Sequence, residues 1–531
     1  MKFSHISIGA GITGFETIFS IVNEVLKKKS NQNKQISIAV IDKNPENIPG
    51  GVGYGFNISK YGFFNNPIRL SPKEFVKWLS QKKIKVKIIN YLKHYGGYTG
   101  KIWIKKNKNF LFSNKKKYFN ELYIPRALSN IWMEEKLFLL LKKIKKKKLK
   151  IKLKFFKGEV IQYRNINKNL KKLYFKNNIC KELHCKISKN KFKKISFFEK
   201  DNIKSIYSKT LSIGLGLPPP KQLASQNAQR SNNYIWDFYA EGSTSILLNK
   251  ISKFKKNKDI VVYFIGYKAG LLESLPELNQ TIRKRKLKIK LLCSSKNLKS
   301  IEKAELSKNR KKYTLKILNK KNLGNINTAK SLYDAILKEF EFCKTKNYDS
   351  YDAWTEILKQ NILDKCIVNF KNSQKIVYSK FYHSKIRNQT RFTYPETINA
   401  REYLNKKKIL ITKKEQVKKV DVIKKRLVVK TSNGKNKFKN YLCDIVVNVS
   451  GPQSVKDIKN EVPIINFLKL NGAKLSSGSF LVDKNFSIKG IKNIYTTGIL
   501  ASNFNPERKT IFNAILKNSK VAGKSIAKLI T

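Results

Sequence analysis

The chain has 531 residues, of which 41% are hydrophobic, and these include 31 Phe and 24 Tyr. This composition provides enough apolar volume for buried cores, and it excludes a simple disordered polycation, which would lack aromatic and β-branched side chains. No run of about 18 uninterrupted apolar residues occurs, so we predict no membrane-spanning helix.

The chain is strongly basic, with 112 Lys and Arg against 35 Asp and Glu and a formal net charge of +77 at pH 7. Nearly all of the basic residues are lysines, and they are spread along almost the whole chain. A specific nucleic-acid site would concentrate them in one patch and favour arginine. We therefore interpret the charge as a compositional bias that attracts polyanions weakly, and we predict no specific nucleic-acid partner.

The six cysteines are sparse and irregularly spaced, which is typical of a chain from a reducing compartment and indicates no disulfide framework. His184 lies beside Cys185, and Cys180 lies five residues earlier, but nothing completes a four-ligand set, so we predict no metal site. The amino-terminal stretch lacks the small-residue cleavage site of a secretory signal. We therefore expect a cytoplasmic protein.

A dinucleotide-binding pattern opens the chain. An apolar strand at Phe3–Ile8 is followed by G-x-G-x-x-G and a helical pattern, with glycines at Gly9, Gly11 and Gly14. A second apolar strand, Ile36–Ile41, ends in Asp42. Strand, glycine turn, helix, strand and acidic residue stand in the order that a dinucleotide site requires.

Each residue of this pattern has a physical role. Gly9 permits the tight turn, Gly11 lets the backbone approach a diphosphate, and Gly14 lets helix and strand pack closely. The helix N-terminus offers free N–H groups to the phosphates. Asp42 would accept hydrogen bonds from the ribose hydroxyls. A glycine-rich strand–turn–helix without a ligand remains the alternative.

Further motifs follow in chain order. GGVGYG at 50–55 precedes FFNNPIRLSPKEFVKWL at 63–79. Together these resemble the FAD/NAD(P)-binding flavoprotein family that is related to flavin-dependent monooxygenases and amine N-hydroxylases. The resemblance continues in five later segments, YIPR at 123–126, TLSIGLGLPPP at 210–220, NYIWDF at 233–238, IVVNVSGP at 445–452 and NIYTTGIL at 493–500.

The resemblance implies an FAD site. Gly9, Gly11, Gly14 and Asp42 would hold the ADP half of the cofactor. The flavin side of the pocket would be lined by Gly53, Tyr54, Asn66 and Pro67. Two later glycines, Gly451 and Gly498, would let strand ends approach the cofactor, although ordinary turns are the alternative for both. Ile499 and Leu500 stand where family members often carry an acidic residue.

A second nucleotide-type unit follows. A buried strand at 259–265 leads into Gly266, with Lys268 where the family's second glycine is expected and Gly270 as partial compensation. Lys268 either adds a contact to phosphate or disables NAD(P)H binding. The next strand ends in three residues that would suit the 2′-phosphate of NADPH, Ser294, Ser295 and Lys296, although an ordinary loop is the alternative.

The predicted fold is α/β, with two Rossmann-like dinucleotide-binding lobes and a helical insertion. We assign residues 1–240 to the first part of the FAD-binding lobe and 245–400 to the smaller NAD(P)-type lobe with the insertion. Residues 405–531 would return to the FAD-binding lobe and end in a helix. Apolar spacing predicts insertion helices at Ser331–Cys343 and Ser350–Leu363, and a terminal helix at 510–530.

These features predict an FAD-dependent oxidoreductase, with a monooxygenase as the favoured class. NADPH would supply electrons, and O₂ and a small organic molecule would be the substrates. Because flavin chemistry resides mostly in the cofactor, the sequence identifies no catalytic side chain. The alternative is a degenerate flavoprotein fold that serves as a binding or scaffold protein without NAD(P)H activity.

Overall fold

A computed structural model describes the chain apart from several short segments. It covers residues 1–531 except 28–34, 56–60, 147–149, 168, 188–191, 193, 239–241, 256–257, 268, 296–301, 304–312, 320, 383–384, 387–388, 390–391, 434–436 and 503–510. No helix among the described residues is long and apolar enough to cross a membrane.

The first sheet has seven strands in the order β19-β6-β1-β2-β3-β4-β5. In chain order they are β1 Lys2–Ile8, β2 Ile36–Asp42, β3 Ile151–Asn167, β4 Leu170–Ile187, β5 Ile195–Asn202, β6 Ile206–Ile213 and β19 Ile494–Thr496. The strands from β19 to the start of β3 are parallel, whereas β3, β4 and β5 form an antiparallel extension. This arrangement is that of a doubly wound nucleotide-binding sheet.

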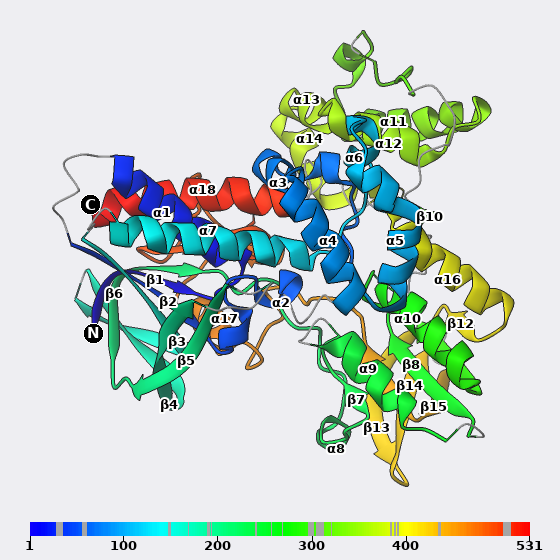
Figure 1. The fold of residues 1–531 in the computed structure, drawn as a ribbon, viewed down its shortest axis with the longest axis horizontal. Helices are drawn as coiled ribbons and strands as arrows, with labels where there is room; N and C mark the ends of the chain where they lie inside the picture. Colours follow the sequence, from blue (N-terminus) through cyan, green and yellow to red (C-terminus); the bar gives the residue numbers. More distant parts are fainter. Residues whose placement is uncertain are drawn as a thin grey trace.

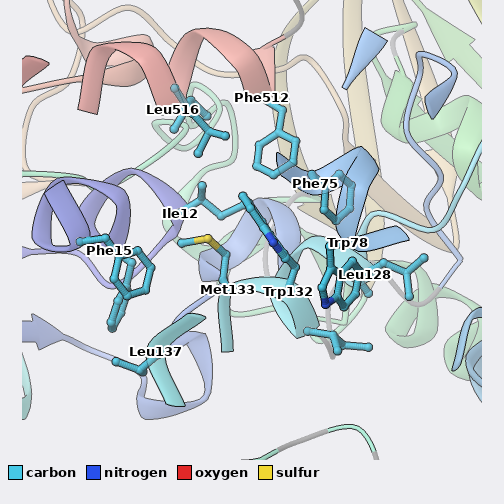
Figure 2. Close-up of a cluster of buried hydrophobic side chains, with 14 of the residues drawn as sticks. Ile12, Phe15, Phe75, Trp78, Leu128, Trp132, Met133, Leu137, Phe512 and Leu516 are labelled. Carbon is cyan, nitrogen blue, oxygen red and sulfur yellow. The ribbon is translucent and has the colours of Figure 1, made fainter. Parts of the chain in front are cut away.

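Three long helices lie side by side along the first sheet, as Figure 1 shows: α1 Ile12–Lys27, α7 Ala127–Lys146 and α18 Ile511–Ile530. Their apolar faces meet in one core with side chains of α3 Lys73–Leu79, and Figure 2 shows Phe75, Trp132 and Phe512 in that core. The other helices before β3 are α2 Gly51–Tyr54, α4 Lys82–Tyr95, α5 Gly97–Phe112 and α6 Lys116–Asn120. The expected terminal helix is confirmed as α18.

The second sheet has five parallel strands in the order β12-β9-β8-β16-β7. They are β7 Tyr234–Ile235, β8 Ile260–Ile265, β9 Ile289–Ser294, β12 Leu410–Lys413 and β16 Ile445–Asn448. Helices α9 Ser243–Ser252, α10 Ala269–Arg285 and α16 Pro395–Lys406 accompany it. A three-stranded antiparallel sheet lies beside it, made of β13 Gln416–Ile423, β14 Arg426–Ser432 and β15 Phe438–Cys443.

The two halves share one plan. In each, a central strand leads through a helix to its parallel neighbour, as β1-α1-β2 and β8-α10-β9. The strand orders β19-β6-β1-β2-β3 and β7-β16-β8-β9-β12 correspond position by position. In the first half β4 and β5 continue the sheet antiparallel from β3, and in the second half the separate antiparallel sheet β13-β14-β15 follows β12 along the chain. The expectation of two Rossmann-like lobes in an α/β fold is confirmed.

The expected lobe boundaries differ from the strand pairing. Strands β12 and β16, at residues 410–448, pair within the second sheet, and only β19 at 494–496 rejoins the first. The chain therefore returns to the first sheet after residue 448 rather than at about 405. In the same way, β7 belongs to the second sheet although it precedes residue 240.

The helical insertion has its own apolar core. It comprises α11 Ala329–Thr345, α12 Ser350–Lys359, α13 Ile362–Val368, α14 Asn372–Val377 and a π-helical turn, η5, at Tyr378–Tyr382. The first predicted insertion helix is confirmed as α11. The second is split, because Asn361 adopts a left-handed conformation with φ of 52° between α12 and α13. Figure 1 shows the insertion on the opposite side of α5 from the second sheet.

A buried histidine in β1 gives a testable pH dependence. His5 is fully buried, and its ring nitrogens bond the Thr210 hydroxyl at 2.9 Å and the Ser212 hydroxyl at 3.0 Å. Desolvation lowers the pKa of His5 to about 3. As the pH falls below about 6.5, the His5 imidazole becomes protonated in the unfolded chain but stays neutral in the folded chain. His5 therefore makes the protein less stable at lower pH.

We expect His5 to account for about 2 kcal/mol of the stability lost between pH 7 and pH 5. Urea unfolding of the wild type and His5→Gln at both pH values measures this contribution, because the other titrating groups cancel in the comparison. The variant should show a pH-dependent loss smaller by that amount. Equal losses in the two proteins would contradict a neutral buried imidazole.

Candidate functional site

The first glycine turn lies at the carboxyl end of β1 and leads into α1. Gly9 has φ of +98°, and a Cβ there would lie 2.6 Å from Gly214 O. At Gly14 a Cβ would lie 2.2 Å from Gly9 O, so both positions exclude any side chain. The Gly9 N–H donates to Ile41 O at 2.8 Å, which ties the turn to β2.

Gly11 differs from its two neighbours. A Cβ at Gly11 would meet the Gly51 Cα at 3.5 Å and otherwise only atoms at 3.9 Å or more, which are ordinary contacts. Packing within the chain therefore does not require glycine here, although Gly51 lies against Gly11 on the side where a Cβ would point. Glycine at this position is what a dinucleotide site needs for close approach of a diphosphate.

The amino terminus of α1 carries backbone donors that have no acceptor within the helix. The first hydrogen bond inside the helix runs from the Phe15 N–H to Gly11 O at 3.0 Å. The N–H groups of Ile12, Thr13 and Gly14 therefore have no acceptor within the helix. Free N–H groups and the positive end of a 16-residue helix make this turn suitable for phosphate.

Asp42 stands at the end of β2, next to the turn. Its Oδ2 accepts the Ala10 N–H at 2.8 Å, and its Oδ1 accepts the Asn44 N–H at 2.9 Å. The carboxylate therefore braces the glycine turn, a role that the sequence pattern did not reveal. Each carboxylate oxygen can accept a second hydrogen bond, so both functions are compatible in one side chain.

The sequence analysis missed two glycines of this site. Gly51 has φ of +67°, and a Cβ there would lie 2.7 Å from Gly11 Cα, so the Gly50–Gly51 segment lies directly against the first turn. The predicted Gly53 has no atom within 4 Å of a Cβ position and lies exposed on α2. The doubled glycine of GGVGYG was the available signal for Gly50 and Gly51.

The late glycine Gly498 lies beside the same turn. It has φ of +72°, and a Cβ would lie 3.3 Å from the Thr13 hydroxyl oxygen in the first turn of α1. The 3₁₀ turn η6, Gly498–Leu500, follows β19 and therefore stands at the carboxyl edge of the first sheet. The structure thus brings Gly9, Gly11, Gly14, Asp42 and Gly498 together.

The segments expected to line the flavin pair with each other. Phe64 donates its N–H to Ile124 O, and Arg126 donates its N–H to Gly62 O, each at 3.0 Å, so 62–68 runs antiparallel to 122–126. Asn66 is half-buried, and Pro67 is buried where it begins a 3₁₀ turn, η3 Ile68–Leu70. The pairing gives the two motifs one shared position in the fold.

Tyr54 connects this region to the core. Its ring packs against Phe64 and Phe512, with centroids 5.9 Å and 5.7 Å apart. Burial raises the pKa of the Tyr54 hydroxyl, the nearby Arg126 charge lowers it, and the Glu273 charge raises it. The hydroxyl therefore lies within the electrostatic range of both charged residues.

The second turn repeats the first at the carboxyl end of β8. Gly266 has φ of +103°, and its N–H donates to Ser294 O at 2.8 Å, as the Gly9 N–H donates to Ile41 O. Helices α1 and α10 both begin three residues after their turn glycine. Leu271, fully buried, therefore occupies the position of Gly14, while Gly270 is the second residue of α10. Lys268 lies outside the described residues.

The three residues proposed for a 2′-phosphate differ in their accessibility. The Ser294 hydroxyl is buried and accepts a hydrogen bond from the Tyr263 hydroxyl at 2.8 Å, so it does not face a ligand. Ser295 is half-buried, and its N–H donates to Lys413 O at 3.1 Å. Because Ser294 corresponds to Ile41, Ser295 corresponds to Asp42. Lys296 lies outside the described residues.

Gly451 lies elsewhere than expected. It follows β16, a strand of the second sheet, and a Cβ on Gly266 would lie 2.8 Å from the Cα of the preceding residue, Ser450. Gly451 has φ of 87°. Its position is therefore beside the second turn rather than beside the first, because β16 pairs with β8.

Helix α10 docks the second lobe on the first. Glu273 forms an ion pair with Arg126, and Glu277, one helical turn further on, also contacts the first lobe, at the start of α5. The Glu277 carboxylate accepts the Thr99 N–H and hydroxyl, both at 2.8 Å, and the Tyr98 N–H at 3.2 Å at the start of α5. Burial raises the pKa of Glu273, and the Arg126 charge opposes that rise.

Comparisons with known proteins agree with this architecture. No protein-family model and no curated protein matches the sequence. The chain is similar to the ornithine N-hydroxylase of Kutzneria sp. 744, determined with reduced FAD, NADP⁺ and L-ornithine, with a TM-score of 0.51, 10% identity and 99% of each chain covered. For the ornithine hydroxylase of Pseudomonas aeruginosa the TM-score is 0.49, with 9% identity and 100% of each chain covered. At this identity the likeness to the Kutzneria enzyme shows the fold alone, which agrees with the two nucleotide-binding-type sheets described above.

Proposed function

We propose that this chain, which has the fold of two-domain flavoproteins, is an FAD-dependent oxidoreductase that uses NADPH. We further propose that it acts as a monooxygenase on a small organic substrate. The observation that carries the proposal is the first turn, where glycine backbone at Gly11 meets the amino terminus of α1, whose first N–H groups have no acceptor within the helix. FAD, when bound, would supply the two-electron chemistry and the reaction with O₂.

The residues of the first turn fit the ADP half of FAD. The N–H groups of Ile12, Thr13 and Gly14 suit the diphosphate, and the position of the Asp42 carboxylate at the end of β2, beside the turn, suits the ribose hydroxyls. Gly53, Tyr54, Asn66 and Pro67 would lie toward the flavin end, and Gly498 would let the edge of the first sheet approach the cofactor. In this proposal the chain binds and orients the cofactor and excludes water.

The second turn supports a preference for NADPH over NADH. NAD-binding sites place an acidic residue where the adenosine ribose lies, and that carboxylate would repel a 2′-phosphate. The equivalent position here is Ser295, an uncharged hydroxyl at the end of β9. Gly266, Gly270 and Gly451 lie around the same turn. Gly266 and Gly451 are the two for which the structure gives a positive φ.

Ser295→Asp tests this preference. The new carboxylate should repel the 2′-phosphate and accept hydrogen bonds from the ribose of NADH. The preference is the rate constant of flavin reduction by NADPH divided by the rate constant of reduction by NADH. We expect this ratio to fall by about 10-fold, equivalent to about 1.4 kcal/mol. Stopped-flow reduction with each nucleotide measures the ratio. Ser295→Asn, which is uncharged and of the same size, should keep the wild-type preference. An unchanged ratio in Ser295→Asp would contradict the proposed position of the ribose.

The cysteines favour oxygen chemistry over disulfide reduction. Flavoproteins that reduce disulfides need a reactive thiolate close to a second thiol. All six cysteines are free, and five are buried. Burial raises the pKa of Cys180 and Cys293 to about 12, and that of Cys185, the half-buried one, to about 11. None is therefore a thiolate at neutral pH.

A binding protein without NAD(P)H activity is the second candidate. It is favoured by Leu271, which replaces the third glycine of the second fingerprint in the helix that follows Gly266. Such a protein would keep FAD at the first turn and lose electron transfer from the second.

Anaerobic titration of the FAD-loaded protein separates the two candidates. The oxidoreductase proposal predicts that NADPH bleaches the visible flavin bands, and that admitting O₂ restores them with consumption of NADPH. Bound flavin that NADPH does not bleach would favour the binding protein. Candidate small amines and other organic substrates can then be screened for accelerated NADPH oxidation and an oxygenated product.

A further inference from the structure

The Arg126–Glu273 ion pair spans the two lobes at a defined place. Glu273 is the fifth residue of α10, about 6 Å along the helix from its start at the second turn. Arg126 immediately precedes α7 and is fixed by its N–H bond to Gly62 O at 3.0 Å. The pair therefore lies between the helix that follows the second turn and the segment expected to line the flavin.

Local packing fixes the Arg126 guanidinium against bare backbone. A Cβ on Gly62 would lie 2.5 Å from one terminal nitrogen of Arg126 and 3.0 Å from its Nε, so the guanidinium lies directly against the Gly62 backbone. The Nε atom is buried and has no hydrogen-bond partner among the described residues. Of the two side chains, that of Arg126 is 23% exposed and that of Glu273 is 15% exposed, so the pair is only partly covered by protein.

The Arg126–Glu273 pair lies between the two proposed nucleotide sites. Dinucleotides lie across the carboxyl ends of parallel strands, with their diphosphates at the helix amino termini. Electrons pass between two such cofactors where their rings meet, so the proposed function would bring the two rings together between the lobes. Arg126 and Glu273 come from opposite lobes, and Tyr54, beside the first turn, lies within the range of both charges.

We infer that Arg126 and Glu273 lie beside the flavin ring and set its reduction potential by opposing charges. This inference rests on the proposed function. Reduction adds negative charge to the ring, so Arg126 favours the reduced form and Glu273 disfavours it. The two side chains act through their charges, and neither takes part in a bond-making or bond-breaking step.

Two variants should therefore move the potential in opposite directions. In Arg126→Gln the ratio of reduced to oxidised flavin at fixed potential should fall about 10-fold, and in Glu273→Gln that ratio should rise about 10-fold. For a two-electron couple each change is a shift of about 30 mV, measured by equilibration with a reference dye. Glu277→Gln is the matched control, because Glu277 lies on the same helix and Tyr98 and Thr99 at the start of α5, rather than Arg126, donate to its carboxylate. Its potential should stay at the wild-type value.

The outcomes separate this inference from the proposed function. Wild-type protein that binds no FAD would overturn both. Bound FAD with potentials that stay unchanged in both variants, or that move in the same direction, would overturn the ion-pair inference alone. Glu273→Gln keeps the shape of the side chain, and the amide oxygen can still accept a hydrogen bond from Arg126. If Arg126→Gln fails to fold, Glu273→Gln alone decides, by a raised or an unchanged potential.

Discussion

Replacing Gly14 by alanine will weaken FAD binding about 100-fold, a loss of about 2.8 kcal/mol. The new Cβ would lie 2.2 Å from Gly9 O and 2.8 Å from the Ser7 hydroxyl oxygen. Gly9 O is backbone, and its residue is bonded to β2, so α1 must move away from β1 instead. That movement displaces the N–H groups of Ile12 and Thr13 from the diphosphate.

Fluorescence titration of apoprotein with FAD measures this effect, and circular dichroism confirms that the variant is folded. Gly324→Ala is the control, because a Cβ at Gly324 meets no atom within 4 Å and the residue lies in a 3₁₀ turn of the insertion, far along the chain from the turn. The control should bind FAD as the wild type does. Wild-type affinity in Gly14→Ala would show that FAD does not lie on this turn.

Glu339→Gln will destabilise the helical insertion by roughly 3–5 kcal/mol. The Glu339 carboxylate is fully buried and accepts hydrogen bonds from the Tyr313 hydroxyl and from three backbone N–H groups. Those N–H groups belong to Lys316 at 3.0 Å, Ile317 at 2.9 Å and Leu318 at 2.7 Å. A glutamine would direct its NH₂ group at one pair of these donors and leave them without an acceptor.

Hydrogen exchange across residues 313–345 measures the local stability of the insertion directly, since local unfolding need not involve the two lobes. Faster exchange in Glu339→Gln is the expected result. Glu341→Gln, two residues further along α11 on an exposed position, should exchange as the wild type does. Equal exchange in all three proteins would contradict the role of Glu339 in holding the segment at 313–318.

Local patterns could be predicted from the sequence. The turn at Gly9, the acidic end of β2 and the helix α11 follow from glycine spacing and apolar periodicity, which are set by neighbouring residues. Gly451 could not be placed in this way, because its position depends on β16 pairing with β8, a contact between segments about 180 residues apart along the chain. The same nonlocal pairing moved the return to the first sheet beyond residue 448.

Side-chain partners were also beyond the sequence. Ser294 and Ser295 look equivalent in the chain, yet the pleat of β9 buries Ser294 against Tyr263 and leaves Ser295 half-buried. The hydrogen bond from the Ala10 N–H to the Asp42 carboxylate could not be predicted either, because it depends on how the end of β2 lies beside the glycine turn. Glu339 reads as an ordinary polar position of an amphipathic helix, although it is the buried acceptor of a distant loop.

Equilibrium dialysis of the folded apoprotein against FAD tests the central claim most directly. We expect one FAD per chain, displaced by excess ADP, because the turn at Gly9–Gly14 holds the adenosine diphosphate half. Retention of no FAD by protein that circular dichroism shows to be folded would contradict the account. FAD that binds but is not displaced by excess ADP would likewise place the cofactor away from this turn.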